Sequence, residues 1–299
     1  MQVGIYLSCF YTISLIKFIS YSTYSFGAFL SLNASDHAST SEELLNISAV
    51  MELYVINMAQ SAQRWEYIQH YLQQKGLEPT RVDAVNGRAL STAECLVHYD
   101  ENLNDRHYFS SLKAAEIGCF LSHKKAMETF LAQSNKPYLL LLEDDIEFCF
   151  NIASAAPSWF DVLASPIPTM LKLYTKRSVL GGTEGFGVCG QIVRPYLIPL
   201  GAVAQVLNRA AVKKLLLLCE RFFMPVDVAY QYWWKHGVRV LVASPSQVRE
   251  ISQSLDGSSI GGSIGLTQRQ KILREIGRSW FRLKLQVLSY WHYFKTRII

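Results

Sequence analysis

The chain has 299 residues and a mass of 33.9 kDa, enough for one large hydrophobic core or two modest ones. Half of the residues are hydrophobic and 18% are charged, which excludes an intrinsically disordered protein. The formal net charge is +5. Residues 267–299 carry eight Lys/Arg and one acid, a net charge of +7, so the rest of the chain has a net charge of about −2. This distribution excludes a generally basic, nucleic-acid-binding domain.

The first fifty residues differ in character from the rest. Two uncharged stretches, 3–16 and 18–32, flank Lys17. Each is too short to cross a bilayer, and the basic start of a signal peptide is missing. We expect residues 1–50 to be either an artefact of an upstream start choice or a weak membrane anchor, with a catalytic domain over 51–266.

A strand, a helix and a second strand open that domain. "ELYVIN" (52–57) is apolar, "SAQRWEYIQHYLQQKG" (61–76) has apolar residues at helical spacing, and "TRVDAV" (80–85) is again apolar. Ser61 is the expected N-cap of the helix and Gly76 its C-cap. This order predicts a βαβ unit with parallel strands.

The alternation continues along the chain. Helical spacing over 115–133 leads to the strand "PYLLLLE" (137–143), and later come a strand (201–207), a helix capped by Asn208 and a strand over 238–243. The pattern predicts an α/β fold with a doubly wound, mostly parallel sheet covered on both faces.

Three carboxylates, Glu143, Asp144 and Asp145, follow the buried strand. Ligands of open α/β sheets bind beyond the carboxyl ends of strands. Side-chain alternation predicts Glu143 and Asp145 on one side, with Asp144 turned away. Such carboxylates suit Mg²⁺ or Mn²⁺ carrying a diphosphate, and the alternative is a solvated strand end.

Two further segments carry candidate site residues. Glu116 and His123 lie seven residues apart and therefore on nearly one face of the predicted helix, although His123 can equally be an ordinary helical histidine. Asp227 follows Pro225 before an aromatic-rich stretch, where it is either a helix N-cap or a general base over an acceptor hydroxyl.

Seven segments together resemble glycosyltransferase family 25. They cover about residues 51–260, and "EIGCFLSH" followed by "LLEDD" is the most specific pair. The segments read, in order, "ELYVINMAQSAQRWEYI", "VDAVNGRAL", "EIGCFLSHKKAMETF", "PYLLLLEDDIEF", "MLKLYTKR", "GAVAQVLNRAAVKKLL" and "PVDVAYQYWW".

The resemblance implies a GT-A-like, Rossmann-type fold and an inverting transferase. The expected activity moves a hexose, galactose before glucose, from a UDP-sugar to a lipooligosaccharide or lipopolysaccharide acceptor. It implies Mn²⁺ or Mg²⁺ held by Asp145 and Glu143, with Asp227 as base or acceptor anchor. Position by position, the expected donor-binding residues are Asn57, Arg64, Glu116, Ser122, His123, Glu143 and Asp144.

Two other classes of function remain open. "GSSIG" (257–261) and "GGSIG" (261–265) match the serine-hydrolase pattern G-x-S-x-G, but "SQSLD" precedes them instead of a strand, and only His292 in the tail lies downstream as a base. "GFGVCG" (185–190) matches a dinucleotide-binding pattern, yet Pro195 argues against the helix it requires. The basic tail raises a non-catalytic membrane-surface protein as the other alternative.

The tail and the cysteines bear on location. Six cysteines without a C-x-x-C pair predict free thiols in a reducing compartment.

Residues 267–299 have an apolar stripe and a separate arginine row, which predicts an amphipathic helix. This helix either packs on the core or binds an anionic membrane. We expect a cytoplasmic protein at the inner face of the cytoplasmic membrane. The stripe comprises Ile272, Ile276, Trp280, Leu283, Val287, Trp291 and Phe294.

Overall fold

The computed structural model describes residues 47–251 and 268–296 of the chain. All of these lie in one compact unit, residues 39–299, and the other unit, residues 1–38, is outside the described part. Most of the expected leader and both G-x-S-x-G matches therefore fall outside the described residues. Ile47, just before Met51, is buried in the core, so core packing begins upstream of the first strand.

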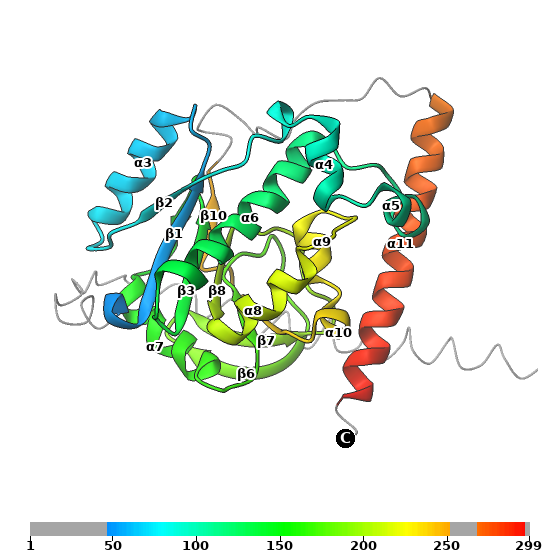
Figure 1. Ribbon diagram of the computed structural model, residues 1–299. Helices are drawn as coiled ribbons and strands as arrows, with labels where there is room; N and C mark the ends of the chain where they lie inside the picture. The colour runs from blue at the N-terminus through cyan, green and yellow to red at the C-terminus, as the bar shows by residue number, and fades with distance from the viewer. Residues whose placement is uncertain (1–46, 252–267, 297–299) are drawn as a thin grey trace, which may run out of the picture. The chain divides into compact units, whose positions relative to one another are not determined.

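An eight-stranded mixed sheet forms the centre of the domain (Figure 1). Its order is β2-β1-β3-β8-β5-β9-β7-β6. Only β8 and β7 run against the other six strands, because each pairs with its neighbours in antiparallel register. The prediction of an α/β fold with a mostly parallel sheet is confirmed. The strands are β1 Met51–Asn57, β2 Thr80–Asp83, β3 Tyr138–Glu143, β5 Thr169–Lys172, β6 Gly181–Gly187, β7 Gly190–Pro195, β8 Ala204–Asn208 and β9 Arg239–Ser244.

The predicted βαβ unit is present at one edge of this sheet. β1 pairs in parallel with β2 and with β3, and α3 connects β1 to β2. A separate two-stranded sheet joins β4 to β10 next to the end of β3. The remaining elements are β4 Ile146–Phe148, β10 Val248–Glu250, α3 Ala62–Gln73, η1 Gly87–Ala89, α4 Thr92–His98, α5 Glu101–His107, α6 Ala114–Gln133, α7 Ile152–Leu163, α8 Arg209–Leu218, α9 Val226–Tyr230, α10 Trp233–His236 and α11 Gln268–Lys295.

The apolar run of β3 is buried on both faces. Leu139 and Leu141 pack with α6 and α8 in one core cluster, whereas Leu140 and Leu142 pack with α3 and α7 in the other. A strand covered on both faces needs no polar alternation, which explains the unbroken leucines. Since Glu143 continues the Leu139–Leu141 row, its side chain emerges on the α6 side of the sheet.

Helix caps agree only partly with the sequence prediction. The Asn208 side chain caps α8 by accepting a hydrogen bond from the Ala211 N–H at 2.9 Å, as predicted. Ser61 is the N-cap residue of α3, as predicted, but its side chain makes no capping hydrogen bond, and the C-cap is Gln74, so the prediction of Gly76 is wrong. The Ser61 carbonyl accepts a hydrogen bond from Asn57 Nδ2, because the β1–α3 turn is built around the asparagine.

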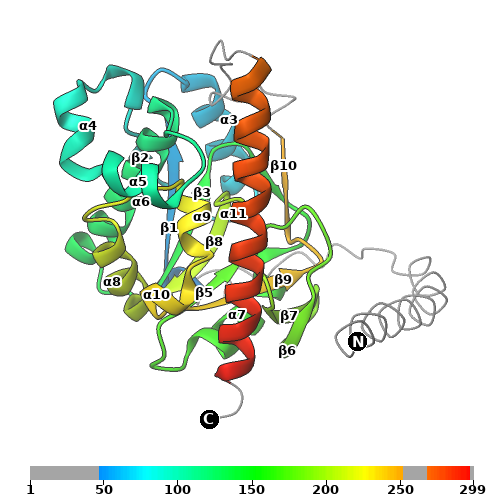
Figure 2. The ribbon, with the colours of Figure 1, turned by 90° about the vertical axis from the view of Figure 1, so that its right-hand side faces the viewer.

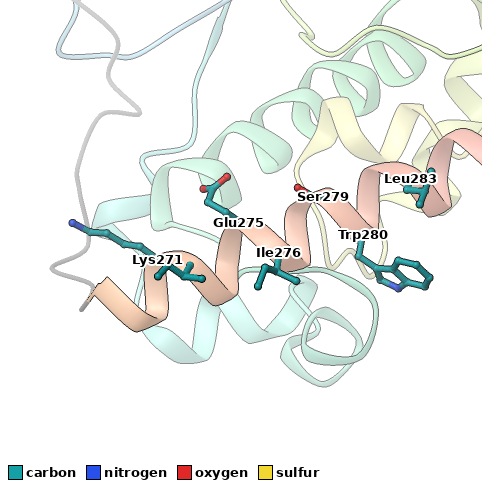
Figure 3. Close-up of a pocket in the computed structure, with 7 residues that line it drawn as sticks. Lys271, Glu275, Ile276, Ser279, Trp280 and Leu283 are labelled. Atoms are coloured by element: carbon teal, nitrogen blue, oxygen red, sulfur yellow. The ribbon is translucent and has the colours of Figure 1, made fainter.

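The C-terminal helix α11 is packed against the domain (Figure 2). Every fourth residue on one side is buried: Phe281, Leu285, Ser289 and Tyr293. The stripe predicted from the sequence is exposed. Figure 3 shows three of its residues, Ile276, Trp280 and Leu283. Among the described helices, none is long and apolar enough to cross a membrane.

Candidate active site

A pocket of about 470 Å³ lies at the carboxyl ends of β1, β2 and β3. Its walls come from the β1–α3 turn, the segment after β2, the middle of α6 and the end of β3. This is the edge at which α/β sheets bind ligands, as the sequence predicted. Six predicted site residues line the pocket: Arg64, Ser122, His123, Glu143, Asp144 and Asp145.

Two glycines bring the segment after β2 onto α6. A Cβ added to Gly118 would lie 2.5 Å from the Val85 carbonyl oxygen, and one on Gly87 would lie 1.8 Å from that of Ala114. The Ser122 hydroxyl accepts a hydrogen bond from the Val85 N–H at 2.8 Å and donates to the Gly118 carbonyl at 2.6 Å. Ser122 therefore fastens this wall of the pocket.

Arg64 joins the two aspartates of the acidic motif. Its Nη2 forms ion pairs with Asp144 Oδ1 and, at 2.9 Å, with Asp145 Oδ2. Asn57 Nδ2 donates to Asp144 Oδ2 at 2.6 Å, so the buried Asn57 contacts the motif and not the pocket surface.

The predicted grouping of the three acids is therefore half right. Asp144 does turn away from Glu143, as alternation requires. Asp145 follows Asp144 to Arg64 instead of sharing a side with Glu143. The reason is local, because β3 ends at Glu143 and the alternation of a strand does not extend into the bend that follows.

The Asp145 carboxylate is unusually basic. Burial, and next the negative charge of Glu143, raise its pKa to about 7, although Arg64 opposes the rise. Its Oδ1 is buried and has no hydrogen-bond partner among the residues that the structure describes. The pKa of Asp144 is also raised, mainly by burial. Glu250 adds a fourth carboxylate to the pocket.

An unpartnered carboxylate oxygen among further carboxylates fits a hard divalent cation. Asp145 offers Oδ1, and Glu143 lies close enough to raise the pKa of Asp145. Asp145 Oδ1 therefore fits as one ligand of the Mn²⁺ or Mg²⁺ expected from the sequence.

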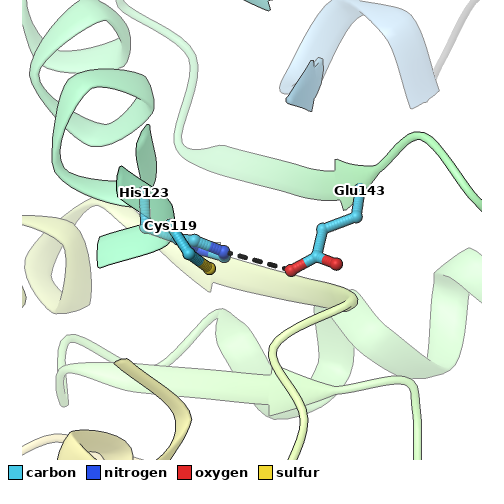
Figure 4. Close-up of side chains that lie close together, drawn as sticks. All are labelled: Cys119, His123 and Glu143. Carbon is cyan, nitrogen blue, oxygen red and sulfur yellow. Dashed lines mark ion pairs between the residues drawn. The ribbon is translucent and has the colours of Figure 1, made fainter. Parts of the chain in front are cut away.

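On the α6 side, Glu143 faces His123 (Figure 4). His123 is buried, with Nε2 at 3.6 Å from Glu143 Oε1 and Nδ1 at 3.3 Å from Gln205 Nε2. Cys119, one helical turn before His123, completes a group whose sulfur, nitrogen and oxygen atoms all lie within 4.8 Å of one another. Burial, followed by the charges of Glu143, Asp227 and Glu116, raises the pKa of the Cys119 thiol well above its usual range. Neutral Cys119 thus lies among three carboxylates.

Asp227 lies outside the pocket wall but close to it. The negative charge of Asp227 helps to raise the pKa of Cys119, and Cys119 lines the pocket. Asp227 is in the first turn of α9 and is not its N-cap, which is Pro225. Its Oδ2 accepts a hydrogen bond from the Gly201 N–H at 2.9 Å and its Oδ1 one from the Val228 N–H at 2.8 Å. These bonds orient the carboxylate and leave further lone pairs for a substrate hydroxyl.

Glu116 has a different position from that predicted. Its Oε2 accepts a hydrogen bond from the Lys113 N–H at 2.7 Å in a capping box at the start of α6. It does not line the pocket. Its observed role is to begin the helix that carries Cys119 and His123.

Sequence reasoning missed Lys172, Gln205 and Glu250. Lys172 is fully buried in β5, donates to the Pro199 carbonyl and has a pKa lowered to about 8 by burial, against the effect of Asp227. One lysine inside the apolar run "TMLKLY" was a usable signal. Gln205 and Glu250 had none, because only the tertiary fold brings β8 next to His123 and β10 to the pocket.

The chain was also compared with known proteins. Residues 50–160 match the family model described as glycosyltransferase family 25 (LPS biosynthesis protein). The mouse "inactive glycosyltransferase 25 family member 3" is 28% identical over 81% of this chain and 46% of its own length. Human procollagen galactosyltransferase 2 is 30% identical over 32% of this chain and 16% of its own length. The chain thus spans less than half the length of these relatives.

Among solved structures, a glycosyltransferase involved in glycosylation of the major capsid of PBCV-1 aligns with a TM-score of 0.39 and 8% identity, covering 77% of this chain and 99% of that one. The evidence for the family is instead the match in sequence. That match includes β1, the pocket-lining part of α6 and the acidic motif after β3. The resemblance recognised in the sequence is confirmed: residues 50–160 are similar to glycosyltransferase family 25, as are parts of relatives that carry the family's name.

Proposed function

We propose that the protein is an active, inverting glycosyltransferase. It moves a hexose, galactose before glucose, from a UDP-sugar to a saccharide of lipooligosaccharide or lipopolysaccharide. The observation that carries this proposal is the buried, unpartnered Asp145 Oδ1 among the other carboxylates of a pocket at the sheet edge. The words "LPS biosynthesis protein" in the family description support the acceptor class.

Arg64 and Asp227 have different tasks in this proposal. Arg64 supplies positive charge beside the acidic motif, where a donor diphosphate would lie. Asp227 is oriented by two backbone N–H groups. A carboxylate so placed can accept the proton of the acceptor hydroxyl while that oxygen attacks the anomeric carbon and UDP departs with the bonding electrons.

Asp145 and Glu143 would hold Mn²⁺ or Mg²⁺, which when bound neutralises charge that develops on the departing diphosphate. His123 lies beside Glu143 on the α6 side, with Nε2 3.6 Å from Oε1, which is beyond hydrogen-bond distance. The buried Asn57 donates a hydrogen bond to Asp144 from β1 and so orients that acid. His123 lines the pocket and can contact the donor, whereas Asn57 does not line it.

A donor-binding protein without turnover is the second candidate. It is favoured by Arg64, which already pairs with both aspartates, and by a mouse relative whose name contains "inactive". Calorimetric titration with UDP and Mn²⁺ measures binding, and mass spectrometry of acceptors after incubation with UDP-sugars measures transfer. Hexose added to a truncated lipooligosaccharide supports the transferase, whereas binding without any product supports the second candidate.

A further inference from the structure

The two long sides of α11 have opposite surroundings. On the core side, Tyr293 Oη accepts a hydrogen bond from the Gly182 N–H at 3.1 Å and Ser289 donates to the Tyr196 carbonyl at 2.6 Å. Phe281 meets the Tyr108 ring edge-on at 5.1 Å between centroids. These contacts fix the rotation of the helix about its own axis.

Large apolar side chains occupy the other side. At 100° per residue they lie roughly opposite the buried row. Each is between 51% and 66% exposed, although soluble proteins seldom leave so long an apolar strip uncovered. The strip consists of Ile272, Ile276, Trp280, Leu283, Val287, Trp291 and Phe294.

The strip is not a pocket for a small molecule. Within the described part of the chain, the residues that line the groove of about 630 Å³ along it all belong to α11, among them Ile276 and Trp280 (Figure 3). A binding cavity needs walls from more than one element to enclose its ligand. The groove is therefore part of an open, elongated surface.

Basic side chains border the strip on both flanks. Arg282 and Lys284 are the two sequence neighbours of Leu283. Each is rotated by about 100° from Leu283 around the helix axis, in opposite directions, and both are exposed. The exposed Lys295 lies over the Trp291 ring at 5.0 Å. Over 268–295 there are seven basic residues and one acid, Glu275, which makes +6. Charge complementarity therefore argues for an anionic occupant. A second copy of the chain would bring one +6 helix against another.

We infer that α11 binds an anionic lipid surface while it remains packed on the catalytic domain. Its apolar strip enters the interface between headgroups and acyl chains, its basic flanks meet the anionic headgroups, and Trp280 and Trp291 lie at the depth that tryptophan favours. The helix lies in the membrane plane and does not cross it. This arrangement would keep the pocket near a lipid-anchored acceptor, but the inference rests on α11 alone and not on the proposed activity.

The test uses the full chain with vesicles of phosphatidylcholine containing phosphatidylglycerol. Trp280→Ser/Leu283→Ser removes part of the strip, and Arg282→Glu/Lys284→Glu reverses its flanks. Leu217→Ser is the matched control, because Leu217 is equally exposed but lies on α8. We expect each α11 variant to reduce the partition coefficient about tenfold or more and the control to leave it unchanged. High salt should weaken binding of the unmodified chain.

Melting curves of all variants serve as the folding check, since every substituted side chain is exposed. Vesicle binding that all three variants and high salt leave unchanged would overturn the inference. It would equally be overturned by concentration-dependent dimers that form without lipid and disappear in Trp280→Ser/Leu283→Ser, because the strip would then be an interface between copies.

Discussion

At the scale of single residues, the Asp145 carboxylate lies in an environment that is unfavourable for a negative charge. Burial and Glu143 both disfavour its charged form, and Arg64 compensates only in part. A carboxylate held in this way costs folding free energy at neutral pH, and a bound cation relieves that cost. Ionisable groups with strongly perturbed pKa values are common at functional sites.

We expect Asp145→Asn to stabilise the protein at high pH. The pKa of Asp145 is raised in the folded state, from 3.8 to about 7, so its unfavourable effect grows as the pH rises through this window and is complete above it. The replacement should raise the free energy of unfolding by about 2 kcal/mol at pH 8 and by almost nothing at pH 3. Denaturant unfolding at both pH values measures the difference.

Asp161→Asn is the control for that comparison, because Asp161 is an exposed acid on α7. Addition of Mn²⁺ at pH 8 should stabilise the unmodified chain and the control but not Asp145→Asn. Equal stability of Asp145→Asn and the unmodified chain at pH 8 would mean that Asp145 is not strained.

Asp227→Asn should reduce turnover by about 10²-fold or more while UDP affinity stays nearly unchanged. The amide keeps the size of the side chain and can still accept the hydrogen bond from Gly201, but it cannot take a proton from the acceptor. Steady-state kinetics and titration with UDP separate the two effects. Loss of UDP affinity would instead assign Asp227 to the donor side.

Residue roles were only partly predictable from the sequence. The acidic motif could be found because three acids end an apolar strand. Other roles depend on side-chain geometry between distant segments. Examples are the ion pairs of Arg64 with Asp144 and Asp145 and the hydrogen bond between Ser122 and the Val85 backbone. A pattern along one chain does not contain that information.

At the scale of elements, the contact between α6 and the segment after β2 shapes one pocket wall. We expect Gly118→Ala to cost about 2 kcal/mol or more, because its Cβ would lie 2.5 Å from the Val85 carbonyl oxygen and the wall must move. UDP affinity should fall about tenfold as Val85 and Gly87 shift. Thermal unfolding and calorimetric titration measure these changes.

Ala132→Gly provides the control within the same helix. Ala132 is exposed near the end of α6, so its replacement changes helix propensity, at about 1 kcal/mol, without touching the pocket. If Gly118→Ala and Ala132→Gly bind UDP equally well, the close approach at Gly118 does not shape the donor site.

Elements with strong periodicity were predicted well. The βαβ unit, α6 and α8 with its Asn208 cap appear close to their expected bounds. The hairpin of β6 and β7 was not predicted, because glycines in "GGTEGFG" give little strand propensity and pairing with β9 supplies the missing stability. The structure agrees that no helix follows "GFGVCG", since β7 occupies that position.

At the scale of the whole molecule, α11 is part of the folded domain. Phe281 and Trp280 are adjacent in sequence, but Phe281 is 9% exposed and Trp280 66%. We expect Phe281→Ala to lower the free energy of unfolding by about 3 kcal/mol and Trp280→Ala to change it by less than about 0.5 kcal/mol. Denaturant unfolding of the two variants side by side makes the comparison, and equal effects would mean that the helix is not docked through the Phe281 row.

The distribution of charge also belongs to this scale. The sequence located the basic residues in the tail and predicted an amphipathic helix there, and the helix is present. It offered packing on the core and membrane binding as alternatives. The structure shows packing through a row that the sequence stripe did not include, because one helix can carry two apolar sides. Hydrophobic periodicity alone does not say which side faces the protein.

Transfer of hexose by the purified full chain is the most direct test of the central proposal. The measurement is mass spectrometry of truncated lipooligosaccharide acceptors after incubation with UDP-galactose or UDP-glucose, with Mn²⁺ or with EDTA, for the unmodified chain and Asp145→Ala. We expect one added hexose with Mn²⁺ only, and none for the folded variant. Full transfer in EDTA, or undiminished transfer by Asp145→Ala, would contradict the assignment of this pocket as a metal-dependent donor site.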